Sequence, residues 1–178
     1  MARQGEKITK EFLESQYGFD VVKIPETNQK TPDFEVRKNG ELLFYCEEKT
    51  MNENDFEGEK PDPAYNSITR KIHESVNQFN SVNGERNYPN VLVLNNMDSL
   101  RNINDLAITV TGKALTEEGK WLQIRNVSNT TQNDKKIVDL ILWFDKGRFI
   151  NFVTLNPTYT KDLAEFFGVE EIHQMETK

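Results

Sequence analysis

The sequence of 178 residues predicts an α/β protein, because helical and strand patterns follow one another along the chain. Apolar residues recur at helical spacing in residues 67–82. Two apolar runs without alternation, 42–46 and 91–94, are typical of central strands that are covered on both faces. The pair Asn39-Gly40, just ahead of the first run, predicts a tight hairpin turn.

The first element expected is a helix over residues 5–16, which Gly18 ends. Residues 19–24 read as a strand closed by Pro25, and residues 34–37 as the strand that enters the hairpin. The polar stretch 50–66, after the second hairpin strand, is expected to be a loop. It would act as a substrate gate or be only a disordered connection.

Beyond the strand at 91–94, residues 103–110 fit either a helix or a strand. Three further strands are expected, at residues 121–127, 137–144 and 149–155. The last two are joined by a hairpin at residues 145–147, and these strands either extend the main sheet or form a small lobe. Thr158 or Thr160 is expected to cap a final amphipathic helix that stops at Gly168.

Length and composition predict a single domain, with a core at about residues 5–96 and a C-terminal β extension at about 97–178. No apolar run approaches the length of a membrane span, and the N-terminus lacks the apolar region of a signal peptide. The single Cys46 is expected to be a small core residue. A cytoplasmic, reducing location is the simplest interpretation.

Two acidic residues and a lysine stand beside the first hairpin. Pro32-Asp33 opens one strand, and Glu47-Glu48-Lys49 lies at the end of the next. Side chains at i and i+2 of a strand share a face about 6.5–7 Å apart, so Glu47 and Lys49 point one way and Glu48 the other. Folding at the hairpin places Asp33 roughly across from Glu47. The two carboxylates could then share one Mg²⁺, which takes oxygen ligands.

The acid-x-Lys pattern is common and has a simpler interpretation. It recurs in this chain at residues 118–120, 134–136 and 176–178. None of these copies ends a long apolar strand with a Pro-Asp partner upstream. The simpler alternative is that Glu47 and Lys49 form only a cross-strand ion pair.

With Pro32-Asp33 and Glu47-x-Lys49 in these places, the sequence resembles the PD-(D/E)xK superfamily of restriction-endonuclease-like nucleases, and most nearly the small Holliday-junction-resolvase-like members. The resemblance covers roughly the first 80 residues. It implies a mixed sheet flanked by helices, to which this chain adds a C-terminal β-hairpin and helix. It also implies that Asp33, Glu47 and Lys49 are catalytic, with Mg²⁺ or Mn²⁺ bound by the two acids.

Members of this superfamily often carry one more acid on the first helix, and the helical wheel selects Glu6. At about 100° per residue, Leu13 and Tyr17 lie within about 20° of Glu6, at the edge of the apolar stripe. Glu11 and Glu14 lie about 140° and 80° away, toward the polar side. Glu6 is therefore the expected third metal ligand. The alternative is an ordinary first-turn acid, favoured by the helix dipole.

Members also often present a lysine or a glutamine from the helix that follows the catalytic strand. Lys71 and Gln78 are seven residues apart on the margin of the apolar stripe of residues 67–82. We expect them to bind phosphate or to position water. As plain flanking residues they would look the same.

The resemblance implies a metal-dependent nuclease that cleaves DNA in repair, recombination or host–phage defence, and a homodimer is left open. The net charge of −7 argues against this function, because DNA is a polyanion. A basic stripe is one answer, and its candidates are Arg70, Lys71, Lys135 and Lys136. The alternative function is a catalytically silent restriction-like fold that serves as an acidic module for binding nucleic acid or protein.

Overall fold

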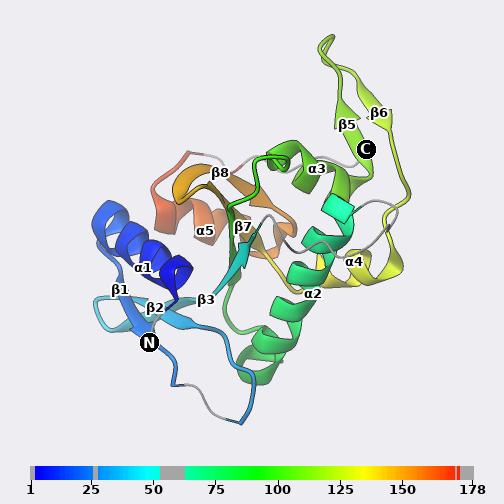
Figure 1. Ribbon diagram of the computed structural model, residues 1–178. Helices are drawn as coiled ribbons and strands as arrows, with labels where there is room; N and C mark the ends of the chain where they lie inside the picture. The colour runs from blue at the N-terminus through cyan, green and yellow to red at the C-terminus, as the bar shows by residue number, and fades with distance from the viewer. Residues whose placement is uncertain (1–2, 26–27, 53–62, 171, 173–178) are drawn as a thin grey trace.

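The computed structural model describes residues 3–25, 28–52, 63–170 and 172. It confirms the α/β class, because a mixed sheet lies between two layers of helices (Figure 1). In chain order the elements are α1 (Gln4–Tyr17), β1 (Asp20–Lys23), β2 (Phe34–Lys38), β3 (Glu41–Met51), α2 (Pro63–Asn83), β4 (Asn90–Asn96), α3 (Ile103–Thr111), β5 (Lys113–Leu115), β6 (Trp121–Gln123), α4 (Asn129–Asp134), β7 (Leu140–Asp145), β8 (Arg148–Thr154), the 3-10 helix η1 (Pro157–Tyr159) and α5 (Thr160–Phe167). None of the described helices is long and apolar enough to cross a membrane.

The main sheet has six strands in the order β1-β2-β3-β4-β7-β8. The strands β1, β2 and β3 are antiparallel neighbours, β3, β4 and β7 run parallel, and β8 returns antiparallel to β7. Each parallel step needs a crossover connection, and α2 supplies the first while α3 and α4 lie in the second. The strands β5 and β6 form a separate two-stranded sheet that projects from the body (Figure 1).

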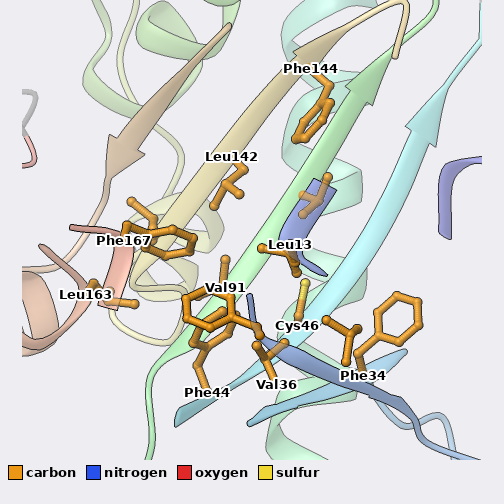
Figure 2. Close-up of a cluster of buried hydrophobic side chains, with 14 of the residues drawn as sticks. Leu13, Phe34, Val36, Phe44, Cys46, Val91, Leu142, Phe144, Leu163 and Phe167 are labelled. Carbon is orange, nitrogen blue, oxygen red and sulfur yellow. The ribbon is translucent and has the colours of Figure 1, made fainter. Parts of the chain in front are cut away.

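Two hydrophobic cores fill the spaces between the sheet and the helices. The helices α1 and α5 pack on one face, where Leu13 and Phe167 are buried (Figure 2). The helices α2 and α3 pack on the other face, around Ile72 and Trp143. Alternate residues of β4 enter the two cores, which explains its apolar run without alternation. Cys46 is fully buried in the first core, as expected.

The turn between β2 and β3 has the conformation that its sequence predicts. Asn39 and Gly40 have φ angles of 52° and 84°. Two successive positive φ angles are what a two-residue hairpin loop of this type requires, and asparagine followed by glycine adopts them at low cost. The hairpin expected at residues 145–147 is also present, with φ angles of 48° at Lys146 and 78° at Gly147.

A β-bulge decides which residue of β3 lies across from Asp33. The pairing of β2 with β3 shifts by one residue between Val36 and Arg37. Without that shift, the register at the turn would carry Asp33 opposite Cys46, in line with the α1 face of the sheet. With the shift, Asp33 comes level with Glu47, on the α2 face.

Two boundaries near the motif differ from the prediction. The strand β3 continues past Lys49 to Met51, so the motif lies inside the strand and not at its end. The helix α2 begins at Pro63, because the last residues of the stretch 50–66 are helical rather than a loop. The acidic part of that stretch, within residues 53–62, lies outside the described residues.

Several predictions for the C-terminal half need correction. Residues 103–110 are helical, because Asn102 and Asp105 form a capping box at the start of α3. The strand expected over residues 121–127 is confined to Trp121–Gln123 and pairs only with β5. The helix α4, which Ser128 caps, was not expected.

The prediction that a threonine caps the last helix was wrong. The side chain of Asn156 accepts a hydrogen bond of 2.9 Å from the amide of Thr158 and starts η1. That turn leads directly into α5, whose first residue is Thr160. An asparagine side chain reaches the free amides of a first turn as well as a threonine does. The end of α5 at Gly168, with φ of 62°, is as expected.

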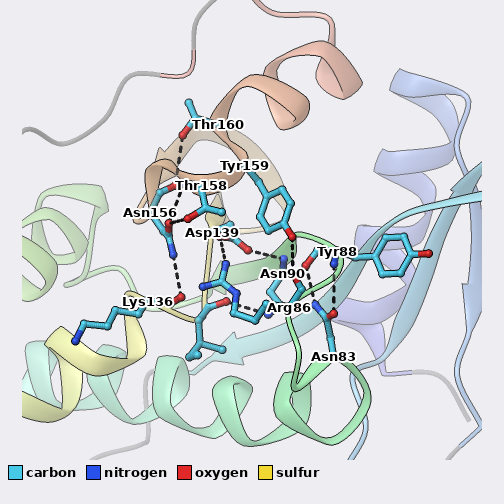
Figure 3. A network of polar contacts seen from close by, with 11 residues as sticks. Asn83, Arg86, Tyr88, Asn90, Lys136, Asp139, Asn156, Thr158, Tyr159 and Thr160 are labelled. Atoms are coloured by element: carbon cyan, nitrogen blue, oxygen red, sulfur yellow. Dashed lines mark hydrogen bonds and ion pairs between the residues drawn. The ribbon is translucent and has the colours of Figure 1, made fainter.

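A buried polar network joins the starts of β4 and β7 to η1 (Figure 3). The carboxylate of Asp139, which has no exposed surface, pairs with Arg86 and accepts a hydrogen bond of 2.8 Å from the amide of Asn90. The hydroxyl of Tyr159 donates to the carbonyl of Arg86. Burial raises the pKa of Asp139 to about 6. The network therefore anchors η1 and α5 to the parallel strands, and the loss of any one of its hydrogen-bonding partners would be costly.

Candidate active site

Asp33 and Glu47 meet through their backbone and side-chain groups. The amide of Asp33 donates to Oε2 of Glu47 at 3.0 Å, and the amide of Glu48 donates to Oδ2 of Asp33 at 2.9 Å. The hairpin register produces this exchange, because it sets Asp33 level with Glu47 where β2 begins. The predicted placement of Asp33 across from Glu47 is therefore confirmed.

Lys49 completes the predicted set. Its ammonium group lies 2.7 Å from Oε1 of Glu47, and both side chains point toward α2, as strand periodicity requires. Gln78 of α2 reaches the same place: it donates to the carbonyl of Thr31 at 3.0 Å, and it also forms a hydrogen bond that favours the charged form of Glu47. Gln78 therefore lies in the same pocket lining as Asp33, Glu47 and Lys49, next to Glu47.

Glu48 points to the other face of the sheet, as predicted. Its Oε1 accepts a hydrogen bond of 2.6 Å from Thr50 and lies against Gly5 of α1. A β-carbon at Gly5 would stand 2.1 Å from that oxygen, so only glycine permits this approach of helix and strand. Glu48 is 3% exposed and is thus held apart from the pocket on the α2 side.

Lys23, at the end of β1, was missed by the sequence reasoning. Its ammonium group lies 2.8 Å from Oε2 of Glu6 and 2.9 Å from Oδ1 of Asp33. It also stands 5.2 Å from the centre of the Phe34 ring. Burial lowers its pKa, but the hydrogen bonds to the two carboxylates outweigh that effect and leave the pKa above its ordinary value. The available signal was a lysine near the end of an expected strand, two residues before Pro25.

The helical wheel placed Glu6 correctly relative to the other acids of α1. Glu6 is 3% exposed, whereas Glu11 and Glu14 are exposed and form i,i+4 ion pairs with Lys7 and Lys10. The carboxylate of Glu6 approaches Asp33 only through the ammonium of Lys23. Its role as a metal ligand stays a prediction.

The environment of Glu47 resists its ionisation. Burial is the main cause that raises its pKa to about 8, and the negative charge of Asp33 adds to the effect. The ammonium of Lys49 acts in the opposite direction but does not cancel it. The pKa of Glu48 rises to about 6, again mainly through burial. Because the buried Glu47 carboxylate, with its raised pKa, lies beside the negative charge of Asp33, a bound cation is favoured there over two free negative charges.

An open pocket of about 380 Å³ gives access to this group. Its lining residues are Arg3, Lys23, Ile24, Gln29, Lys30, Thr31, Pro32, Asp33, Glu47, Lys49, Glu74, Asn77 and Gln78. Four of them are basic and three are acidic, although the whole chain carries a net charge of −7. The pocket is thus locally more positive than the protein, and an anionic group can approach it.

The other basic candidates lie elsewhere. Lys71 is on α2 but is not among the residues that line the pocket, so Gln78 and Lys71 are not brought together there. Arg70 stands 4.0 Å from Glu74 on the same helix. Lys135 donates to the carbonyl of Val110, in α3, at 2.8 Å. The predicted basic stripe therefore does not meet the pocket within the described residues.

The pocket offers a small set of oxygen donors for a metal ion. Among the described residues, no group of three or more His, Cys, Asp and Glu side chains is placed to hold a metal ion. Asp33 and Glu47 form a pair of carboxylates on the pocket wall, and Mg²⁺ commonly takes one or two protein carboxylates and keeps several waters. The pair fits one such ion if it displaces Lys49 from Glu47.

Comparisons with protein-family models, with curated proteins and with solved structures find no match to this chain.

Proposed function

We propose that this protein is a metal-dependent nuclease that hydrolyses phosphodiester bonds in DNA, with Asp33, Glu47 and Lys49 as its catalytic residues. The observation that carries the proposal is their meeting on the wall of one open pocket. There, the amide of Asp33 bonds Glu47 at 3.0 Å and Lys49 stands 2.7 Å from the same carboxylate.

The order of the elements supports a restriction-endonuclease-like core. A helix, three antiparallel strands, a second helix and a strand parallel to the third follow one another as α1, β1, β2, β3, α2 and β4. That order is the one the resemblance implies, and it places the acid-x-Lys residues on the strand at which antiparallel pairing changes to parallel.

Each residue of the site has a role in this proposal. Asp33 and Glu47 would hold Mg²⁺ or Mn²⁺, which when bound would supply Lewis-acid chemistry at the phosphate. Lys49 would stabilise the negative charge that develops on the phosphate oxygens. Gln78, which hydrogen-bonds Glu47, would orient that carboxylate or a water beside it. The positive balance of the pocket offsets locally the charge that argues against DNA binding.

A second candidate function rests on the hydrogen bonds of the same carboxylates. Both oxygens of Glu47 are engaged, by Lys49 and by the amide of Asp33. Both oxygens of Asp33 are engaged as well, by Lys23 and by the amide of Glu48. A closed set of this kind needs no metal, and with the net charge of −7 it suits an interaction module without turnover.

Direct assay separates the two functions. Plasmid, linear, single-stranded and branched DNA, and RNA, are incubated with the protein in Mg²⁺, in Mn²⁺ or in EDTA. A nuclease cleaves at least one DNA with metal and none in EDTA. Cleavage should be lost in Asp33→Asn, which removes a metal ligand, and in Lys49→Met, which removes the stabilising charge.

Matched controls keep the assay specific to the site. Asp20→Asn alters an exposed aspartate at the start of β1, and Lys38→Met alters an exposed lysine at the end of β2. Neither lines the pocket, and both should cleave like the wild type. Activity that survives both Asp33→Asn and Lys49→Met would place the catalytic residues elsewhere, and cleavage of no nucleic acid under any condition would favour the interaction module.

A further inference from the structure

The ammonium group of Lys23 sits in a place built for a cation. It contacts Oε2 of Glu6 at 2.8 Å and Oδ1 of Asp33 at 2.9 Å, and it faces the ring of Phe34 at 5.2 Å. The side chain of Glu6 is 4% exposed and that of Asp33 is 15% exposed. Two poorly hydrated carboxylates and the face of an aromatic ring are each attractive to positive charge.

Asp33 would therefore be shared by two cation positions. One lies toward Glu47, whose carboxylate is bonded to the amide of Asp33. The other lies toward Glu6 and holds the Lys23 ammonium. Glu6 with Asp33, and Asp33 with Glu47, form two pairs of acids, and without the lysine each pair would offer oxygen ligands to one divalent ion.

We propose that Lys23 is a resident cation that limits this site to one divalent metal ion, by occupying the position between Glu6 and Asp33. The inference rests on the proposed metal-dependent function and concerns how many ions that site takes. A tethered ammonium group is present at a high effective concentration, so a free ion displaces it only at a cost in affinity. Lys23 is thus a specificity-determining residue that acts on metal binding and not through contact with the substrate.

Removing the charge of Lys23 should open the second position. In Lys23→Met, Glu6 and Asp33 would face each other without a cation, which costs stability until a metal ion enters. We expect Mn²⁺ counting by electron paramagnetic resonance to give about one bound ion per chain in the wild type and about two in Lys23→Met. Without metal the variant should melt below the wild type, and Mn²⁺ should raise its melting temperature by more.

Two further variants test the cause of the change. Lys23→Arg keeps a positive charge and should stay at about one ion. The double variant Lys23→Met/Glu6→Gln removes the acid that the second ion needs, and it should also return to about one ion while recovering stability in EDTA. Lys10→Met is the control, because Lys10 also joins α1 to β1, through the carbonyl of Val21 at 3.0 Å, but does not line the pocket.

The outcomes distinguish this inference from the function on which it rests. If the wild type binds Mn²⁺ and Lys23→Met binds the same number of ions with the same affinity, Lys23 does not limit the site and only the inference fails. The same conclusion follows if Lys23→Met stays unfolded at saturating Mn²⁺, since an ion should replace the ammonium. If the wild type and every variant bind no Mn²⁺, the metal-dependent function itself fails.

Discussion

The amide of Asp33 donates a hydrogen bond of 3.0 Å to Oε2 of Glu47, so two acidic residues that repel each other are held side by side by the backbone. Glu47 is 1% exposed, and its carboxylate cannot turn into water to escape the negative charge of Asp33. Protonation, an ammonium group or a metal ion can each relieve the repulsion. Stability, pH and metal binding are therefore coupled at this pair.

The metal-free protein should lose stability as pH rises from about 6.5 to 8.5. The pKa of Glu47 is about 8 in the folded protein, above its ordinary 4.5, so the folded state binds more protons than the unfolded state between these values. The stabilising contribution of Glu47 to the free energy of unfolding is thus fully present below pH 4.5 and is lost as pH rises through about 8. The slope should be at most about 1.4 kcal/mol per pH unit, measured by urea unfolding in EDTA.

The variant Glu47→Gln tests the assignment of that slope. It keeps the shape and a hydrogen-bond acceptor for the amide of Asp33 but cannot ionise. We expect a flatter pH dependence and, at pH 8.5, a metal-free stability equal to or above that of the wild type. Glu35→Gln, a half-exposed acid on β2, should keep the wild-type slope. A wild-type stability that rises with pH over this window would contradict the prediction.

Millimolar Mg²⁺ or Mn²⁺ should stabilise the wild type by roughly 1–3 kcal/mol, if the ion is in about 10- to 100-fold excess over its Kd. The reason is that the folded protein alone presents Asp33 and Glu47 as a pair. Glu47→Gln should lose most of this gain. Thermal melts at constant ionic strength measure this stabilisation. Na⁺ buffers of equal ionic strength, free of divalent ions, serve as the reference. Identical melts with and without metal would favour the interaction module.

Glu6→Ala should weaken metal binding, whereas Glu11→Ala should be near silent, within about ±0.5 kcal/mol of stability. Without Glu6, the ammonium of Lys23 would pair with Asp33 alone and compete for the oxygen that the ion needs. Glu11 is exposed and stands 3.8 Å from Lys7, in a surface pair of little energy. Titration of Mn²⁺ into both variants compares them, and a larger effect at Glu11 would refute the helix assignment.

Gly5→Ala should destabilise the protein by about 1–3 kcal/mol, the usual cost of overpacking. Alanine favours a helix over glycine by roughly 0.5–1 kcal/mol, but the added carbon would lie 2.1 Å from Oε1 of Glu48 and 2.5 Å from Oγ1 of Thr50. The clash therefore outweighs the gain in helix propensity. Gln4→Ala, at the exposed neighbouring position, is the control. Chemical denaturation of both variants measures the difference, and a stabilised Gly5→Ala would show that Glu48 yields freely.

Local patterns in the sequence determined a large part of this protein. The stop of α1 at Gly18 and the turn at Asn39-Gly40 follow from positive φ angles that few other residues adopt. The buried strands β3 and β4 follow from apolar runs, and the opposite directions of Glu47 and Glu48 follow from strand periodicity. Each of these properties depends on neighbours a few residues away, which the sequence displays directly.

Only the tertiary structure decided which side chains of the site contact one another. The bulge near Val36 sets Asp33 level with Glu47 and not with Cys46, and the sequence predicted this placement only roughly, because the unbroken apolar run 42–46 does not show where an extra residue lies. The position of Lys23 between Glu6 and Asp33 joins residues from α1, β1 and the start of β2, whose separation along the chain hides their contact. Partners of this kind are set by the packing of the helix on the end of the sheet, because long side chains reach whichever opposite charges that packing brings within range.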